Sequence, residues 1–339
     1  MQLLKIIRFN SWWMVIPPQV LGWIYFCLLV THGTLQAEWP RILLFFTALV
    51  ATSSFGYLLN DFFDVASDKV AGKKNALAGF NYWLRLLFVV LPLLLGIGAW
   101  VLLKIPGLGA NALFALQIVA LTVYSAPPLR LKERSAMGIV ADAFYGHINP
   151  AFIALTAFVP GYSQMVFIGL LVFALIFVCT TLKGLRNILL HQLDDRKKDN
   201  KAGTNTFVRK NGALFTLYFI NNLLPFEIFF TVALCVAISY IFPPFLLSIL
   251  IFAVLTYLKF SGWKLPYLPK RQLKFKFLHF LNDYYEGWIP VFFLLLLSVR
   301  SADFLILLVL HLVLFPSFVI KLWHDLQTIA QNFKTEDDY

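Results

Sequence analysis

The sequence predicts an all-α, polytopic membrane helix bundle of nine or ten transmembrane helices, with two pseudo-repeated four-helix halves around a central cavity. Composition is the first observation behind this fold class. Of the 339 residues, 60% are hydrophobic and only 13% are charged, whereas a soluble domain is about 45–50% apolar and roughly 25% charged. A water-soluble core cannot hide so much apolar surface, so a soluble enzyme is excluded. The same figures exclude a disordered chain.

The second observation is that the apolar residues gather in segments of membrane-spanning length, about 20 residues each. The first segment follows a basic start and lacks a small-residue cleavage site, which indicates a retained helix and not a signal peptide. The fourth, eighth and ninth segments are short. The ten candidates cover residues 12–32, 41–60, 83–103, 109–124, 138–159, 165–188, 212–241, 243–258, 286–299 and 303–320.

The third observation is the distribution of basic residues. In the expected topology, all but three of the 28 Lys and Arg residues lie on one side of the membrane, the exceptions being Arg41, Lys104 and Arg300. The positive-inside rule therefore predicts a cytoplasmic N-terminus. With ten spans the C-terminus is cytoplasmic too; if the last two segments form one broken element, it is not.

An acidic motif at residues 60–68 follows the second segment on the predicted cytoplasmic side. It begins at Asn60, and its acids Asp61, Asp64 and Asp68 are spaced i, i+3, i+7. On a helix these three side chains share one face, where like charges repel one another. A divalent cation resolves that repulsion, and Mg²⁺ prefers oxygen ligands, often shared with substrate phosphates.

A second acidic motif at residues 195–203 follows the sixth segment on the same side. Asp195 and Asp199 are spaced i, i+4, and Gly203 comes one step further along. Either motif alone is also compatible with an ordinary solvated acidic loop. Because the two motifs stand four helices apart, they predict an internal duplication with one metal-binding arm in each half. A cleft between the halves would then hold a metal-bound diphosphate.

The chain is accordingly expected to form one membrane domain over residues 1–339. The first half is expected to cover about 1–135 and the second about 136–258, and residues 259–339 form a C-terminal extension.

A basic loop after the fourth segment supports the diphosphate interpretation. It starts at Tyr124, and two prolines, Pro127 and Pro128, predict a rigid non-helical turn. Arg130 and Lys132 then place cations near the acidic arms, and cations bind diphosphate oxygens directly. The alternative is that both are ordinary positive-inside residues.

At this point the three motifs resemble those of a known family, the UbiA-type intramembrane prenyltransferases. The motif at 60–68 resembles the family's first aspartate-rich motif, and the motif at 195–203 resembles its second. The Tyr-Ser-x-Pro-Pro-x-Arg-x-Lys run at 124–132 is similar to the loop after the family's fourth helix. Order, spacing and the four-helix separation all agree, so the resemblance covers at least the first seven segments.

The resemblance implies a nine-helix bundle in which Mg²⁺ holds an allylic isoprenoid diphosphate. Ionisation would release diphosphate, and the carbocation would alkylate a hydrophobic acceptor. Mg²⁺ and the basic side chains would stabilise the leaving group, and a dry aromatic cavity would protect the carbocation. The implied catalytic residues are Asp61, Asp64, Asp195, Asp199 and Tyr124. The implied metal ligands are Asp61, Asp64, Asp68, Asp195 and Asp199. The implied diphosphate-binding residues are Asn60, Arg130 and Lys132.

The sequence departs from the family pattern in three places. Where many members carry an Arg-Pro pair after the first motif, this chain has residues 72–79, so Lys73 or Lys74 must supply the cation. Where members often carry Asn-Asp before the second motif, this chain has His191 and Gln192. The end of the chain carries one apolar segment too many. These departures bear on the acceptor more than on the fold.

The fifth segment begins with polar residues that lie inside the expected membrane region. Asp142, Tyr145 and Asn149 are spaced i, i+3, i+7 and are predicted to share one face. Intramembrane ionisable residues are functional candidates, so Asp142 and Asn149 are predicted to bind the acceptor. The alternative is that this face only makes interhelical hydrogen bonds that brace a kink at Pro150.

Three functions compete for this sequence. The first is Mg²⁺-dependent transfer of a prenyl group to an aromatic, quinone-precursor or other lipid-soluble acceptor. The second is a terpene cyclase on the same scaffold, which needs no acceptor. The third is a transporter, which is disfavoured because the acids lie at helix ends and not at mid-membrane. The expected partners are an isoprenoid diphosphate, a hydrophobic acceptor and the lipid bilayer, with no nucleic acid.

Overall fold

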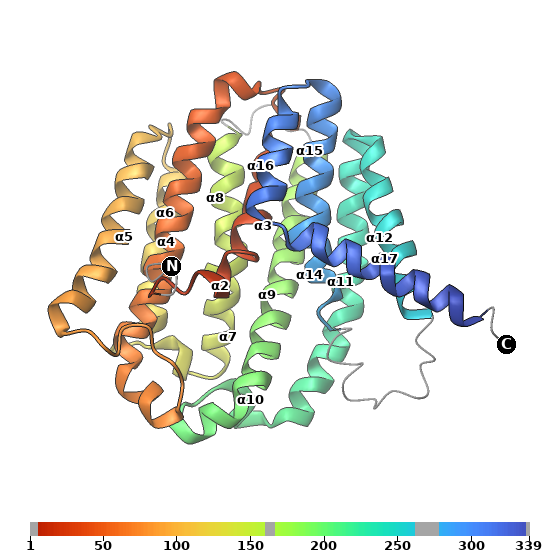
Figure 1. Ribbon diagram of the computed structural model, residues 1–339. Helices are drawn as coiled ribbons and strands as arrows, with labels where there is room; N and C mark the ends of the chain where they lie inside the picture. The colour runs from red at the N-terminus through yellow and green to blue at the C-terminus, as the bar shows by residue number, and fades with distance from the viewer. Residues whose placement is uncertain (1–5, 160–166, 262–277, 337–339) are drawn as a thin grey trace.

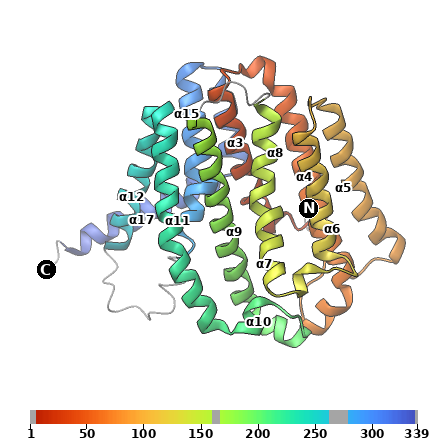
Figure 2. The ribbon, with the colours of Figure 1, turned by 180° about the vertical axis from the view of Figure 1, so that it is seen from behind.

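The computed structural model describes residues 6–159, 167–261 and 278–336, in which helices account for most of the chain and no strand occurs. Figures 1 and 2 show the long helices standing side by side in one bundle, with α17 leaving it at a steep angle. The helices are α2 (Phe9–Trp12), α3 (Ile16–Val30), α4 (Leu35–Ala71), α5 (Tyr82–Leu102), α6 (Gly109–Ser125), η1 (Leu131–Glu133), α7 (Ala136–Ala143), η2 (Phe144–Ile148), α8 (Asn149–Phe158), α9 (Phe167–Ala202), α10 (Phe207–Asn211), α11 (Ala213–Ile241), η4 (Pro243–Phe245), α12 (Leu246–Ser261), α14 (Phe280–Asp283), η5 (Tyr284–Trp288), α15 (Ile289–Arg300), α16 (Phe304–Leu314) and α17 (Ser317–Glu336).

Five helical stretches in the described ranges are long and apolar enough to cross a membrane. They are α4, α5, the Gly169–Ala202 part of α9, α11, and the stretch Pro243–Phe260. The bent pair α16 and α17 would add a sixth, while α3 and α6 are apolar but shorter. The all-helical membrane bundle is confirmed, and the count of nine or ten spans stays a prediction.

The last predicted span, residues 303–320, is wrong as a single straight helix. The chain bends by 74° between α16 and α17, at Phe315 and Pro316. Proline has no backbone N–H to continue the α-helical ladder, so a break at this point is favoured. The indole N–H of Trp13 donates to the Leu314 backbone carbonyl at 2.8 Å. It thereby supplies a hydrogen-bond donor to a carbonyl at the broken helix end.

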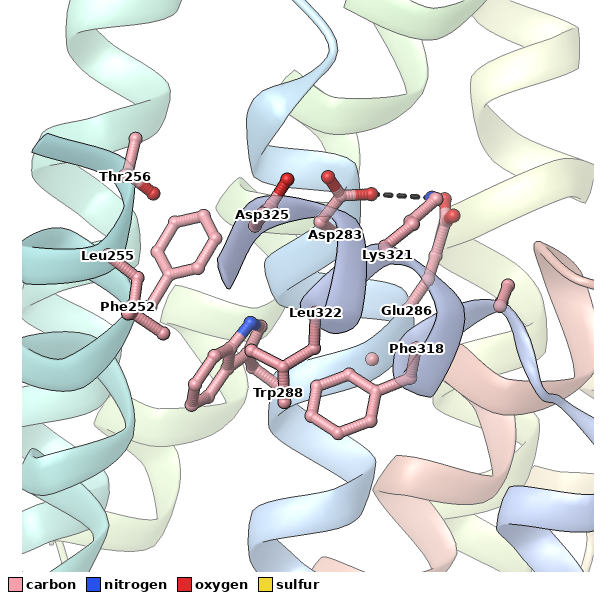
Figure 3. Close-up of a pocket in the computed structure, with 12 residues that line it drawn as sticks. Phe252, Leu255, Thr256, Asp283, Glu286, Trp288, Phe318, Lys321, Leu322 and Asp325 are labelled. Carbon is pink, nitrogen blue, oxygen red and sulfur yellow. Dashed lines mark hydrogen bonds and ion pairs between the residues drawn. The ribbon is translucent and has the colours of Figure 1, made fainter. Parts of the chain in front are cut away.

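Helix α17 packs against α12 and η5 instead of continuing across the bundle. Lys259 pairs with Asp325 at 2.6 Å, and Lys321 pairs with Asp283 at 2.5 Å. Figure 3 shows Lys321 turned toward Asp283 on one side of a small pocket between these elements. That pocket has a volume of only about 30 Å³, which leaves room for water but not for a substrate.

Two π-helices, η2 and η5, interrupt the helices that continue as α8 and α15. Each stands in the same register before a proline, Pro150 after η2 and Pro290 after η5. Single π-helical turns of this kind occur frequently at functional sites. Helix α3 packs against both α8 and α15. The approach to α15 is close, because a Cβ on Gly22 would lie 3.3 Å from the Cβ of Pro290.

The two acidic helices also end alike. Gly72 closes α4 with φ 68°, and Gly203 follows α9 with φ 74°, a left-handed conformation that glycine adopts without strain. With the matched π-helices, these ends suggest where the repeated units lie. We propose that the units are α4–α8 and α9–α15, so that the expected boundaries near 135 and 258 move to the ends of α8 and α15.

A fully buried ion pair joins α9 to α11. The guanidinium of Arg186 contacts both carboxylate oxygens of Glu227, at 2.6 and 2.9 Å, and neither side chain is exposed. The same guanidinium donates to the Leu278 carbonyl and to Asn282. One turn away, Lys183 pairs with Glu286 at 3.0 Å. Lys183 and Arg186 were counted among the basic residues of the cytoplasmic side, and the structure shows both buried inside the bundle, where each pairs with an acid.

We predict that Arg186→Met destabilises the protein by about 3 kcal/mol or more, because it leaves the Glu227 carboxylate buried without a partner. The measurement is thermal unfolding of the protein in detergent. Lys321→Met removes a half-exposed partner of a surface pair and serves as the control, with an expected cost of about 1 kcal/mol or less. Equal losses for the two variants would contradict the prediction, and Arg186→Met/Glu227→Met is expected to recover much of the loss.

Candidate active site

The first acidic motif lies on the last turns of α4, where its three aspartates share one helix face as predicted. Asp61 is fully buried, and its carboxylate pairs with Arg8 at 2.9 Å and accepts from the Ala76 amide at 3.3 Å. Asp68 is less buried and accepts from the Asn75 amide at 2.8 Å. The carboxylates of Asp61 and Asp68 therefore both contact residues outside α4.

Asp64 is bound by the basic loop that follows α6. Arg130 donates to one carboxylate oxygen at 2.8 Å, and Lys132 donates to the other at 2.5 Å. Lys132 also donates to the side chain of Asn60 at 2.8 Å. Burial lowers the pKa of Lys132 below its usual value, and the neighbouring Asp64 carboxylate opposes that shift. The structure thus brings together Asn60, Asp64, Arg130 and Lys132.

The second acidic motif is bound by a cation from the other half of the bundle. The ammonium of Lys73 lies 3.2 Å from Asp195 and 2.9 Å from Asp199. Burial alone would lower the pKa of Lys73, but the hydrogen bond and charge of Asp199, together with Asp195, raise it above the usual value. Of the two lysines predicted to replace the family's cation, Lys73 is the one that contacts the second motif.

The described residues contain no group of three or more His, Cys, Asp or Glu side chains that meets around one point. The five aspartates predicted to bind metal are instead paired with nitrogen donors. Nevertheless, Asp195 and Asp199 already share a single ammonium, so both carboxylates can reach one small cation. Carboxylate oxygens are also the donors that a hard divalent cation prefers, and such a cation often uses only one or two of them.

Two contacts at this site were missed by the sequence reasoning. The Asn75 amide joins the Asp61 backbone carbonyl to the Asp68 carboxylate, both at 2.8 Å. Arg8, near the start of the chain, neutralises Asp61 and stacks over the Tyr57 ring at 5.7 Å. No spacing rule connects residue 8 or residue 75 to α4, so only the fold could reveal them.

A cavity of about 570 Å³ lies inside the bundle and is lined by Asn60 of the first motif and by Asp194, the residue before the second motif. Along α4 it reaches from Asn60 to Phe45, roughly 22 Å at about 1.5 Å per helical residue. Its inner end is aromatic, because the rings of Trp100 and Phe114 stack at 4.3 Å and Phe45 lies beside Trp100. The cavity is therefore deep and apolar inside, with polar groups at the acidic end.

One wall of the cavity carries the polar residues that were predicted in the fifth segment. The Tyr145 hydroxyl donates to Asp142 at 2.5 Å, and the Tyr124 ring meets the Tyr145 ring edge-on at 4.9 Å. All three side chains line the cavity. Asn149 does not line it; its amide donates to Gln117 at 2.8 Å. The π-helical turn between Asp142 and Asn149 changes the register, so the i, i+3, i+7 face does not continue to Asn149.

Helix α9, which packs against α7 and η2, carries the positions that depart from the family pattern. His191 and Asp194 line the cavity near its acidic end, together with Asn187 and Asn282. The ring of His191 lies 3.9 Å from the Asp195 carboxylate. Gln192 is buried, and its side chain accepts from the Val208 amide at 3.3 Å. In this chain, position 192 therefore fixes the turn to α10.

Comparisons with known proteins identify the fold. The model of the UbiA prenyltransferase family matches residues 20–282, and no curated protein sequence matches the chain. A solved structure of a UbiA homolog from Archaeoglobus fulgidus bound to GPP and Mg²⁺ aligns with a TM-score of 0.59 and 16% identity, over 85% of this chain and 98% of that chain. The same homolog bound to DMAPP and Mg²⁺ gives 0.58 and 15%, with the same coverage. A structure of digeranylgeranylglyceryl phosphate synthase gives 0.54 and 19%, over 86% and 96%.

We predict that the paired carboxylates protect Lys73 from amine-modifying reagents, because these reagents attack only the uncharged amine and the pKa of Lys73 is raised. Replacing both partners, as Asp195→Asn/Asp199→Asn, lowers that pKa and should increase the labelling rate of Lys73 at pH 8 severalfold. The measurement is peptide mass spectrometry after timed acetylation. Lys74 is the internal control, and equal increases at both lysines would contradict the pairing.

Proposed function

The chain belongs to the UbiA prenyltransferase family, and on that premise we propose that it is a Mg²⁺-dependent intramembrane prenyltransferase. It would ionise an allylic isoprenoid diphosphate and transfer the prenyl group to a lipid-soluble acceptor. One observation carries the proposal: Asn60 of the first motif and Asp194, next to the second, line one deep cavity, and Lys73 joins the first-motif loop to the second motif. The A. fulgidus UbiA homolog binds GPP and DMAPP with Mg²⁺, which supports the same class of ligand here.

The diphosphate would bind between the two acidic motifs. Asp195 and Asp199 would hold Mg²⁺ in place of the Lys73 ammonium, and Asp61, Asp64 and Asp68 would provide the facing ligands. When bound, Mg²⁺ would neutralise charge on the departing diphosphate. The oxygen donors fit this ion, and its remaining coordination sites would be filled by water and phosphate oxygens.

Basic side chains would then complete the diphosphate site. Arg130 and Lys132 now contact Asp64, at 2.8 and 2.5 Å. A bound diphosphate would offer them phosphate oxygens as alternative partners, and the planar guanidinium of Arg130 suits bidentate contact. Lys73 would be released from Asp195 and Asp199 and could contact the same group. We propose that these cations are exchangeable partners of the acids.

The cavity would hold the prenyl chain and exclude water from the carbocation. Trp100, Phe114 and Phe45 form its inner end, and Tyr57 and Tyr124 lie closer to the acids. Aromatic faces favour a nearby cation, and a dry site prevents its capture by water. Tyr124 would therefore contact the reacting end of the prenyl group.

The proposal also assigns a topology to this multi-pass membrane protein. The acidic ends of α4 and α9 lie together at one end of the bundle, joined by the contact between Lys73 and Asp199. Most basic residues of the connecting segments fall at that end in the expected topology, so we propose that it faces the cytoplasm.

We predict that Asp64→Ala and Asp195→Ala each lower prenyl transfer by roughly 100-fold or more, because each removes a charged group from the diphosphate site. EDTA should abolish transfer by the wild type. The measurement is incorporation of labelled GPP into lipid-extractable product by purified protein in nanodiscs, with a membrane extract as the source of acceptor.

Asp303→Ala, at the opposite end of the bundle, is the matched control and should keep activity within about twofold of wild type. Size-exclusion profiles show whether each variant is folded. Full activity in either motif variant, or in EDTA, would refute the proposed metal-diphosphate site.

A separate experiment distinguishes transfer from cyclisation. Purified protein receives labelled isoprenoid diphosphates of several chain lengths with Mg²⁺ and no acceptor. We expect little product until a membrane extract is added, because the polar wall at Asp142 and Tyr145 offers a binding surface that a cyclase does not need. A cyclic hydrocarbon formed without acceptor would instead identify a terpene cyclase.

A further inference from the structure

The carboxylate of Asp142 belongs to the cavity lining and to neither acidic motif. It stands at the end of α7, immediately before the π-helix η2. Tyr145 donates to it at 2.5 Å, and the Tyr124 ring lies against the Tyr145 ring, with their centroids 4.9 Å apart. Protein surrounds the group, and the accessible surface that it keeps faces the cavity. A carboxylate has about four acceptor positions, so the single phenol donor Tyr145 leaves room for a further donor from a ligand.

A chain of hydrogen bonds holds this carboxylate in position. Gln117 donates to the Tyr145 backbone carbonyl at 2.8 Å, and Asn149 donates to the Gln117 side-chain carbonyl at 2.8 Å. The π-helical turn leaves that Tyr145 carbonyl available to Gln117. The orientation of Tyr145, and through it of Asp142, is therefore set by contacts from α6 and α8.

The corresponding position in the other half presents no charge. Asn282 stands before Pro290 in the same register as Asp142 before Pro150. Its carbonyl accepts from Arg186 at 2.6 Å, and its amide donates to Asn187 at 3.0 Å. Asn282 is thus engaged by protein, whereas Asp142 retains acceptor capacity. At this register position only α7 presents a carboxylate, and the other acid of the lining, Asp194, stands on α9 next to the second motif.

Few basic side chains line the cavity where a carboxylate ligand could bind: the described lining includes His147, His191 and His279, but only one Arg or Lys. Among the described lining residues, Arg8 is the only Arg or Lys, and its guanidinium is paired with Asp61 at 2.9 Å. Two acids, Asp142 and Asp194, line the same space. A ligand carboxylate beside Asp142 would meet a like charge in a medium of low dielectric constant, where the repulsion is strong.

We infer that Asp142 selects an acceptor that presents a neutral hydroxyl group and carries no carboxylate at its reacting end. This inference rests on the proposed function, because it concerns the second substrate of that reaction. The hydroxyl would donate to the free acceptor position of Asp142, beside Tyr124 and Tyr145. Phenols, quinols and lipid alcohols meet this description, and aromatic acids do not. Asp142 is therefore a specificity-determining residue.

The test compares two probes that differ by one carboxylate, 1,4-dihydroxynaphthalene and 1,4-dihydroxy-2-naphthoate. Binding to the full-length protein in nanodiscs is measured by isothermal titration calorimetry, without any prenyl diphosphate. We expect the wild type to bind the neutral probe at least tenfold more tightly. Asp142→Asn should reduce this ratio to below threefold, and Tyr145→Phe should reduce it less. Asp194→Asn, which removes the other acid of the lining, is the matched control and should keep the wild-type ratio.

Three results would overturn the inference: equal or tighter binding of the carboxylate probe, binding of neither probe, or an unchanged ratio in Asp142→Asn. If Asp142→Asn does not fold, the wild-type ratio and Tyr145→Phe decide the question. Binding is measured without prenyl diphosphate, so its outcome is independent of ionisation. A protein that prefers the neutral probe but never releases diphosphate from GPP would refute the proposed function and leave the selectivity intact.

Discussion

Neutralisation of partly buried carboxylates is the constraint on which this structure depends. A charge removed from water is costly unless a partner with good geometry compensates it. In the two acidic motifs, Asp61, Asp64 and Asp199 each obtain that partner from a segment remote in sequence. These pairs place the start of the chain, the loop after α6 and the loop after α4 around one site. The contacts of Lys73 are central, because they join the loop after the first motif to the helix of the second.

The same need for neutralisation explains how a bound ligand could rearrange the ion pairs at this end of the bundle. The nitrogen donors that neutralise the acids are also suitable partners for phosphate oxygens. Exchange of one set of partners for the other would preserve charge balance. In our proposal, the contacts of Arg130, Lys132 and Lys73 therefore describe the protein before diphosphate binding, and their rearrangement accompanies binding.

Deeper in the bundle, irregular helices determine which polar groups reach the cavity. The π-helix η2 changes the register between Asp142 and Asn149, so that one lines the cavity and the other supports it through Gln117. The equivalent π-helix η5 adjoins the buried charges of the second half, where Lys183 pairs with Glu286. At this register the first half presents the carboxylate of Asp142 to the cavity, whereas the second half pairs Lys183 with Glu286 between helices.

By itself, the sequence determined the membrane class, the all-helical bundle and the positions of the two acidic motifs, because composition and helical period act over short stretches of chain. It also predicted that Asp61, Asp64 and Asp68 share a face, which follows from 3.6 residues per turn. Only the tertiary structure decided that Lys73 binds the second motif, that Arg8 neutralises Asp61 and that Arg186 is buried against Glu227. It also decided that the last apolar segment breaks at Pro316. These features depend on how helices remote in sequence pack together, and no local spacing encodes which cation will meet which acid.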